Sequence, residues 1–267
     1  MMRFVFEKRK TLSRKALFLV PLASFFISLI LTAILLAIFK ANPFVTFIAM
    51  FKGAFGSWPN FTETLVKATP LMLTGLGVLV AFRLKFWNIG AEGQLTLGGI
   101  AASWVALFWS PFLPPWMVLP LAILVGMLAG ALWAGIPALL KVRLKVDEVL
   151  TTLMLNYVAI LFAEHLYYGP WRDPKGFGFP GTPQFPEFAW LPRIAGRAHM
   201  GLIFALVLAF ALWFILNRTR WGFELKVIGN NPGAAQTQGI NIAKNVMTAL
   251  LLACLLYTSP SPRDFSC

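Results

Sequence analysis

Long apolar runs without charge dominate the chain. Residues 16–39 and 93–140 contain no Asp, Glu, Lys or Arg. A helix needs about 20 apolar residues to cross a bilayer, so the second run predicts two spans joined by a turn near Pro111 and Pro114. Residues 65–82, 149–168 and 200–216, and a run that begins near Val246, are further candidates. The pattern predicts an all-α fold: a polytopic membrane helical bundle of about seven spans, the last incomplete.

One predicted span is unusually short. Between Lys67 and Arg83 lie only 15 residues, and Pro70 is among them. Fifteen residues cover about 22 Å at 1.5 Å per residue, less than the ~30 Å hydrocarbon core. We therefore expect this helix to be tilted, extended by snorkelling cations, or broken.

The segment after this helix places polar groups inside membrane-type sequence. Phe86–Gln94 contains Asn88, Glu92 and Gln94 among glycines and apolar residues. A carboxylate at bilayer depth costs at least ~2.5 kcal/mol, so a lipid-facing Glu92 is not expected. The segment predicts either a protein-lined pathway or polar side chains that satisfy free backbone groups where a helix breaks, and the residues favour neither.

The excess of basic residues in the chain is explained by its expected membrane topology. The net charge is +13, but the cations lie between the apolar runs and form no separate basic domain, which argues against nucleic acid as a partner. If the N-terminus is cytoplasmic, the inner segments carry more Lys and Arg than the outer ones, as the positive-inside rule requires. Residues 1–15 are then a basic cytoplasmic tail.

The cytoplasmic segment before the last run predicts a short helix of about seven residues. Asn231 suits the N-cap, Pro232 the first turn, and Gly239 the position after the C-cap, followed by an exposed Ile240. So short a helix is unstable alone in water, so we expect a partner protein to hold it. The alternative is an ordinary linker with a helical turn.

Three separated segments resemble the permease subunits of bacterial ABC importers. These are residues 86–94, 146–157 and 228–241, and the resemblance extends over roughly Arg14 to Ala253. The nearest branch is that of nucleoside and simple-sugar permeases, which is related to branched-chain amino acid permeases. The resemblance implies a permease domain at 16–253, incomplete at its C-terminus, that imports a nucleoside or, as alternatives, a simple sugar or a branched-chain amino acid.

The resemblance also implies partners in a bacterial plasma membrane. They are a cytoplasmic ATP-binding subunit, a second permease subunit and an extracytoplasmic solute-binding lipoprotein. The chain contains no Gly-Lys-Ser or Gly-Lys-Thr of a phosphate-binding loop, so ATP and Mg²⁺ would be used by the partner, and this chain is neither an enzyme nor the holder of a cofactor. The residues implied in coupling to the ATPase are Gly229, Asn231, Pro232, Ala234, Ala235, Gly239 and Ile240.

The implied mechanism is alternating access around a central pathway. We hypothesise that Asn88, Glu92, Gln94 and Asn156 lie near this pathway. For Asn156, a hydrogen bond between helices is the stronger interpretation.

Three other functional classes are alternatives to the permease interpretation. A secondary transporter would need inverted repeats, and none is evident; a membrane enzyme would need a catalytic constellation. The two cysteines and two histidines show no metal-ligand spacing. A structural membrane subunit is the third alternative. We also expect residues 254–267 to be a non-native end of a truncated chain.

Overall fold

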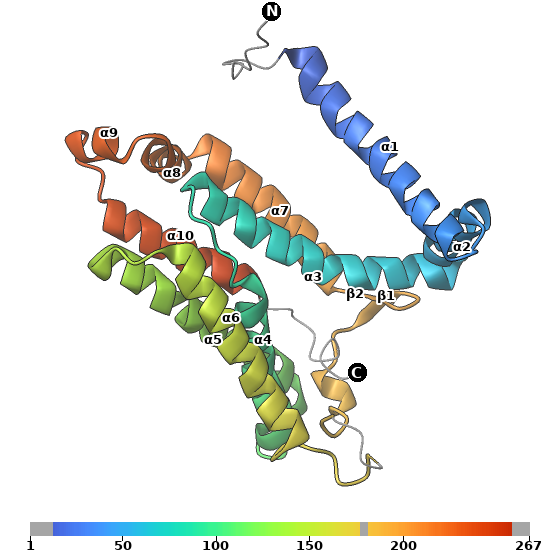
Figure 1. The fold of residues 1–267 in the computed structure, drawn as a ribbon. Coiled ribbons are helices and arrows are strands. Elements are labelled where there is room, and N and C mark those ends of the chain that lie inside the picture. The colour runs from blue at the N-terminus through green and yellow to red at the C-terminus, as the bar shows by residue number, and fades with distance from the viewer. Residues whose placement is uncertain (1–12, 177–180, 258–267) are drawn as a thin grey trace, which may run out of the picture. The chain divides into compact units, whose positions relative to one another are not determined.

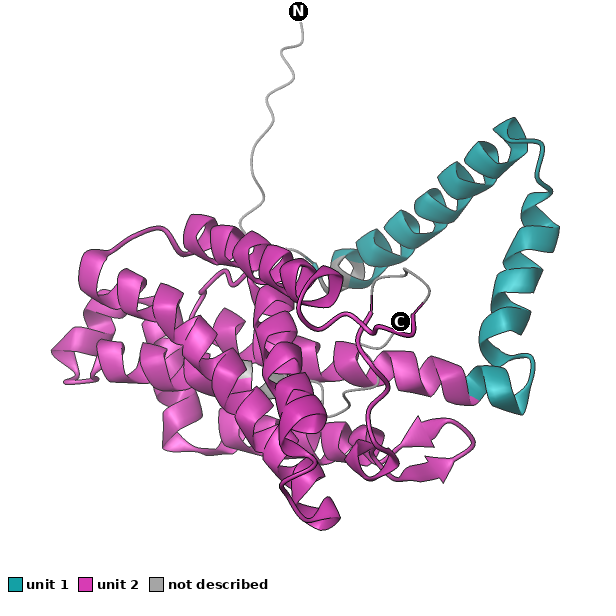
Figure 2. Ribbon diagram, turned by 90° about the horizontal axis from the view of Figure 1, so that it is seen from below, with its two compact units in different colours: residues 1–61 teal, residues 62–267 magenta. Residues whose placement is uncertain are grey.

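The computed structural model describes residues 13–176 and 181–257. Its contacts divide the chain into two compact units, residues 1–61 and 62–267 (Figure 2). Helices make up most of the described structure, and the antiparallel pair β1 (Arg193–Ala195) and β2 (Ala198–His199) is its only sheet. The expected non-native end lies largely outside the described residues.

The described part of the first unit contains two whole helices, α1 (Arg14–Ile38) and α2 (Pro43–Phe55), and the first residues of a third. Ser13 caps α1, and the Asn42 side chain accepts from Phe44 N at 3.0 Å to cap α2. The sequence prediction missed α2, although Asn42-Pro43 is a favoured start for a helix. Neither helix has a buried residue over its apolar length, as expected for helices that face lipid.

The second unit is entered through α3 (Trp58–Arg83) and contains the remaining helices (Figure 1). They are α4 (Ala91–Trp104) with the π-helical turn η1 (Val105–Trp109), α5 (Pro115–Leu144), α6 (Glu148–Tyr168), the 3₁₀ turn η2 (Glu187–Ala189), α7 (Gly201–Arg218), α8 (Arg220–Asn230), α9 (Pro232–Thr237) and α10 (Ile242–Tyr257).

Five of the described helices are long and apolar enough to cross a membrane: 18–38 of α1, α3, α5, α6 and α7. All seven predicted segments are helical, but seven spans are not confirmed. Helix α4 has only 14 residues before η1, and α10 has 16, Ile242–Tyr257, within the described part of the chain. The chain is thus a multi-pass membrane protein with a helical fold.

Helix α3 corrects the expectation of a short or broken span. It continues without interruption through Lys67 and Pro70 for 26 residues, about 39 Å at 1.5 Å per residue. The prediction failed because it took Lys67 as a boundary, whereas the helix begins nine residues earlier at Trp58. The helical path ends after Arg83 instead.

Small residues allow the helices of the second unit to pack closely. Along α5, Ala122, Gly126, Gly130, Ala134 and Ala138 recur every four residues and are buried, and α5 lies against α4 and α10. Side chains from several helices meet in one apolar cluster, here called the central cluster, which includes Val80, Leu84, Phe86, Leu212, Leu216, Leu225, Ile228, Ala235 and Leu250.

The loop between α6 and α7 is folded where it is described. The β1–β2 hairpin turns at Gly196, whose φ is +55°, and a Cβ there would lie 3.0 Å from the Thr62 side chain of α3. The Arg197 Nε also lies 3.0 Å from a Glu63 carboxylate oxygen. The hairpin is thereby fixed to the first turns of α3.

Candidate functional site: a polar helix break and a short capped helix

The chain leaves helical geometry between α3 and α4. Lys85, at φ +55°, ends the turn after α3, and residues 86–89 are extended. Side chains then alternate, as in a strand: Leu84, Phe86 and Asn88 are buried, whereas Trp87 and Ile89 are exposed. The helical path is therefore broken between α3 and α4, and this break presents Asn88 to the protein interior.

The buried amide side chains of Asn88 and Gln94 bond to each other at this break. The Asn88 Nδ2 donates to Gln94 Oε1 at 3.0 Å, and the Gln94 Nε2 donates back to Asn88 Oδ1 at 3.4 Å. The same Asn88 Oδ1 accepts from the Gly90 backbone N at 3.0 Å. Only 2% of Gln94 is exposed, so this amide pair is part of the interior and satisfies backbone at the break.

Helix α6 supplies the remaining polar partners. The Thr152 Oγ1 accepts from Ile89 N at 3.2 Å, and the Asn156 Oδ1 accepts from Gly93 N. Gly90 is the N-cap of α4 and has no side chain to cap it. Gly93 is the third residue of α4, so Asn156 serves as an N-cap from a neighbouring helix.

Two glycines permit this contact with α6. A Cβ at Gly90 would lie 2.9 Å from the Thr152 carbonyl oxygen, and a Cβ at Gly93 would lie 2.8 Å from the Asn156 Cα. Both neighbours are backbone atoms, which cannot rotate away. Glycine is thus required for close approach at both positions.

The start of α4 is recessed relative to α6. Thr152 and Asn156 lie four and eight residues after the first residue of α6, or about 6 and 12 Å along it. Figure 1 shows the extended segment running from the end of α3 alongside the bundle to this recessed start. The polar break consequently lies one to two helical turns inside the bundle.

Glu92 differs from the other three candidates because it is exposed. It lies in the first turn of α4, where a carboxylate interacts favourably with the helix dipole. The Asn156 Nδ2 lies 3.5 Å from Glu92 Oε2. The structure thus brings Asn88, Glu92, Gln94 and Asn156 together, with three buried amides beside one exposed carboxylate.

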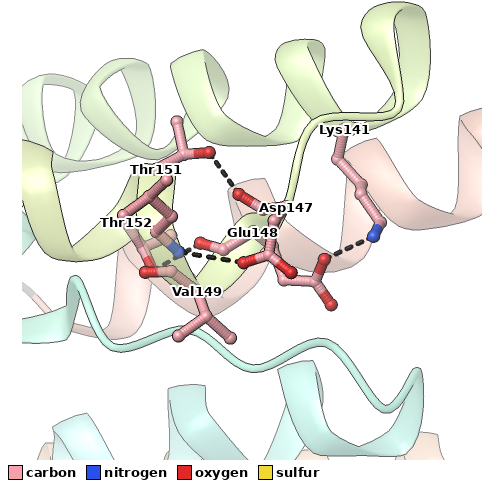
Figure 3. A network of polar contacts seen from close by, with 7 residues as sticks. Lys141, Asp147, Glu148, Val149, Thr151 and Thr152 are labelled. Carbon is pink, nitrogen blue, oxygen red and sulfur yellow. Dashed lines mark hydrogen bonds and ion pairs between the residues drawn. The ribbon is translucent and has the colours of Figure 1, made fainter.

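A second polar network fixes the beginning of α6 (Figure 3). Asp147 caps the helix by accepting from Leu150 N at 3.0 Å, and Lys141 of α5 forms an ion pair with Glu148. The Thr152 Oγ1 also donates to Glu148 O at 2.7 Å. Sequence reasoning missed Thr152, although its position four residues before Asn156 places both on one face of α6.

The predicted short helix is present as α9, with six residues rather than about seven. The Asn231 Oδ1 caps it by accepting from Ala234 N at 3.1 Å. At its end Gly239, at φ +73°, donates to Gln236 O, and Ile240 N donates to Ala235 O, both at 3.0 Å. This is a Schellman motif, as the Gly-Ile pair predicted.

Helix α9 has one face that is buried and one that is exposed. Pro232, Gly233 and Gln236 are exposed, Ala234 is half-buried, and Ala235 is fully buried in the central cluster. Ile240 was expected to be exposed but is half-buried against that cluster. The Schellman motif turns this side chain back onto the protein. The exposed face is polar and small.

Helix α8, which the sequence analysis missed, precedes α9 with only Asn231 between them. Thr219 caps it, and Leu225 and Ile228 are buried. The Glu224 carboxylate accepts from the buried Asn245 Nδ2 of α10 at 3.1 Å and from Arg220 Nε at 3.0 Å. Through the bond to Asn245, Glu224 holds α8 to α10. A cavity of about 330 Å³ opens beside these residues, between α8 and the start of α10.

Substitution of Glu224 is expected to lower stability more than substitution of its exposed partner Arg220. Glu224→Ala removes a charged acceptor from buried Asn245 and is expected to cost about 1.5–3 kcal/mol. Arg220→Ala removes only an i,i+4 pair whose Arg side chain is 91% exposed, worth about 0.3–0.5 kcal/mol. Thermal unfolding midpoints of the two variants in detergent would measure the difference. Equal midpoints would show that Glu224 does not hold α8.

Comparison with known proteins places these features in a family. Residues 60–256 match the family described as the branched-chain amino acid transport system / permease component. The chain is similar to the guanosine ABC transporter permease protein NupP of Bacillus subtilis, with 36% identity over 88% of the chain and 68% of the relative.

Two further relatives are almost as similar. The glucose ABC transporter permease protein TsgB13 of Haloferax volcanii is 34% identical over 88% of the chain and 64% of its own length. The nucleoside ABC transporter permease protein NupB of Lactococcus lactis is 30% identical over 88% of the chain and 67% of its own length. The chain thus spans about two thirds of these relatives. No solved structure matches it. The chain belongs to the family of permease components of branched-chain amino acid transport systems.

Proposed function

We propose that the chain is a transmembrane permease subunit of an ATP-driven importer and that the imported solute is a nucleoside. The observation that carries this proposal is its similarity, over 88% of its length, to permeases named for guanosine and for nucleosides. A simple sugar is the second candidate, because the permease named for glucose is 34% identical. A branched-chain amino acid is the third, from the family description.

The partners we propose follow from the same similarity. Bacillus subtilis has two relatives named as guanosine permease proteins, NupP and NupQ, which supports a second permease subunit beside this chain. A cytoplasmic ATP-binding subunit would hydrolyse MgATP, since the chain carries no phosphate-binding Gly-Lys-Ser or Gly-Lys-Thr. A solute-binding lipoprotein would deliver the solute. The excess of Lys and Arg on one set of segments supports a cytoplasmic N-terminus in a bacterial plasma membrane.

We propose α9 as the helix that docks onto the ATP-binding subunit. Its caps at Asn231 and Gly239 fix both ends, and its buried Ala235 anchors it to the central cluster. Pro232 and Gly233 are exposed on the free face, where a groove of the partner would receive them. Six residues do not form a stable helix alone, so attachment to the bundle and to a partner is needed.

The geometry suggests different roles for the four pathway candidates. Asn88, Gln94 and Asn156 are buried and bonded to each other or to backbone, so they position the break. Glu92 is exposed beside them. A carboxylate accepts hydrogen bonds only, so Glu92 suits the hydroxyl and N–H donors of a polar solute. We assign solute contact to Glu92 and positioning to the three amides.

This assignment predicts the behaviour of Glu92→Gln. The substitution keeps the size and the Asn156 contact but removes the charge, so the amount of assembled protein is expected to stay the same while uptake falls roughly tenfold, the loss of one hydrogen bond to a charged group. Initial rates of radiolabelled solute uptake, normalised to membrane protein, would measure this. Unchanged uptake would remove Glu92 from the pathway.

An uptake assay tests the solute. Cells that carry the chain together with the transport genes at its locus are assayed for uptake of radiolabelled guanosine, glucose and leucine, each measured separately. Uptake of guanosine alone is expected. Uptake of glucose alone would favour the sugar importer, and uptake of leucine alone would favour the amino acid importer.

A further inference from the structure

Helix α8 makes an unusually close backbone contact with the end of α3. Gly229 is buried near the end of α8, and a Cβ built on it would lie 2.2 Å from the Arg83 carbonyl oxygen and 3.2 Å from the Leu84 carbonyl carbon. No side chain separates the two backbones. Any residue other than glycine would have to displace α3 or α8, because a carbonyl oxygen has no rotamer to change.

This contact lies at the beginning of the polar break. Leu84 is the first residue after α3, and Asn88 follows four residues later in the extended segment. The two inward apolar residues of the segment, Leu84 and Phe86, are buried in the central cluster. Helices α8 and α9 contribute Leu225, Ile228 and Ala235 to the same cluster. One packed core thus contacts both the proposed docking helix and the polar break.

Helices α8 and α9 are also firmly joined to each other. Asn231 is the single residue between them, and its backbone N donates to Val227 O at 2.9 Å while its side chain caps α9. On its other side, α8 is held to α10 by the Glu224–Asn245 hydrogen bond. A displacement of α9 therefore moves α8, whose contact with Arg83 and Leu84 has no flexible side chain to absorb it. Close-packed interiors transmit such strain.

We propose that Gly229 is a positioning residue for transport: movement of α9 on the ATP-binding subunit passes through the Gly229–Arg83 backbone contact into the extended segment and changes the position of the Asn88–Gln94 pair. This inference rests on the proposed function. It adds a specific route between the docking helix and the solute pathway, and it assigns the route to α8 and the end of α3.

The test is Gly229→Ala in the assembled transporter, with Gly75→Ala as the matched control. Both replace a helical glycine by alanine, but a Cβ at Gly75 meets nothing within 4 Å. Reconstituted complexes are assayed for bound ATP-binding subunit, ATP hydrolysis and solute imported per ATP. A reporter cysteine at the exposed Ile89, in a chain with Cys254 and Cys267 replaced by Ser, is assayed for nucleotide-dependent labelling.

Gly229→Ala is expected to retain the ATP-binding subunit and hydrolysis, while solute imported per ATP falls about tenfold and labelling at the Ile89→Cys reporter no longer responds to nucleotide. The control should behave as wild type. If Gly229→Ala does not assemble, Phe86→Leu, which loosens the same connection without adding volume, is expected to show the same loss.

Normal import per ATP in an assembled Gly229→Ala complex would overturn the inference while leaving the proposed function intact. If Gly229→Ala fails to assemble, normal import per ATP in Phe86→Leu would likewise overturn the inference and leave the proposed function intact. A wild-type chain that neither retains an ATP-binding subunit nor supports ATP-dependent import would overturn the proposed function, and the inference with it.

Discussion

Gly93→Ala is expected to destabilise the second unit, whereas the chemically identical change Gly75→Ala is expected to stabilise it or leave it unchanged. Replacing glycine by alanine inside a helix favours folding by about 0.5–1 kcal/mol. At Gly93 the new methyl would meet the Asn156 Cα at 2.8 Å and the Ala159 Cβ at 3.2 Å. Overpacking of this kind costs about 1–3 kcal/mol. At Gly93 we expect a cost near the upper end of this range, because the neighbouring Asn156 Cα is a backbone atom that cannot rotate away. The cost therefore exceeds the gain.

The two glycine variants are compared by the temperature at which half of the purified protein loses its monodisperse peak in detergent. At Gly75 nothing lies within 4 Å of the added methyl, so only the helix-propensity gain remains. The opposite signs distinguish a steric requirement at Gly93 from a general intolerance of alanine. Equal shifts for both variants would contradict the close contact between α4 and α6.

Asn156→Ala is the second substitution with a large expected effect. It leaves the buried Gly93 N–H without its acceptor and removes the donor to Glu92. An unsatisfied buried donor costs about 1–3 kcal/mol, and truncation of a side chain that is only 8% exposed adds a cavity. We expect a lower unfolding midpoint and a loss of solute uptake, measured in detergent and in cells respectively.

A double variant separates the two roles of Asn156. In Glu92→Gln/Asn156→Asp the aspartate still accepts from Gly93 N, and the new glutamine donates to the aspartate, so both hydrogen bonds are kept and only the one between positions 92 and 156 is reversed. The double variant is expected to unfold near the wild-type midpoint but to remain deficient in uptake, because position 92 has lost its charge. Full uptake by the double variant would show that the carboxylate is not needed there.

The sequence predicted the polar stretch at Asn88–Gln94 and the short helix α9 better than it predicted the helices that connect them. The break at Asn88–Gln94 and the ends of α9 were correctly placed because Gly, Pro and Asn act locally: Asn231 caps the next turn, and Gly239 adopts φ +73°. Local rules of this kind do not depend on the rest of the fold. The direct bond between Asn88 and Gln94 was not foreseen, since it requires the tertiary path of the extended segment.

The missed elements share a different cause. A hydropathy search treats Lys67 as the end of a span, although α3 accommodates this exposed lysine on its surface and continues. Helix α8 has a polar composition, and its packing depends on Gly229 meeting the carbonyl of Arg83, a residue almost 150 positions away in the sequence. Such a contact between distant segments has no periodic signal along the chain.

The burial pattern also changes the interpretation of the polar residues. The sequence left solute contact and backbone satisfaction equally open for Glu92 and Gln94. Gln94 is 2% exposed and bonded to Asn88, whereas Glu92 is exposed in the first turn of α4. The backbone-satisfying interpretation therefore fits the amides, and solute contact remains a proposal for Glu92 alone.

ATP-dependent guanosine uptake by proteoliposomes is the measurement that tests the central claim most directly. The vesicles contain this chain with its permease and ATP-binding partners, and the solute-binding protein is added outside. The account predicts accumulation that requires this chain and enclosed MgATP and that persists when ion gradients are dissipated. Accumulation that follows an ion gradient without ATP would identify a secondary transporter, and uptake that is unaltered when this chain is omitted would contradict a role in translocation.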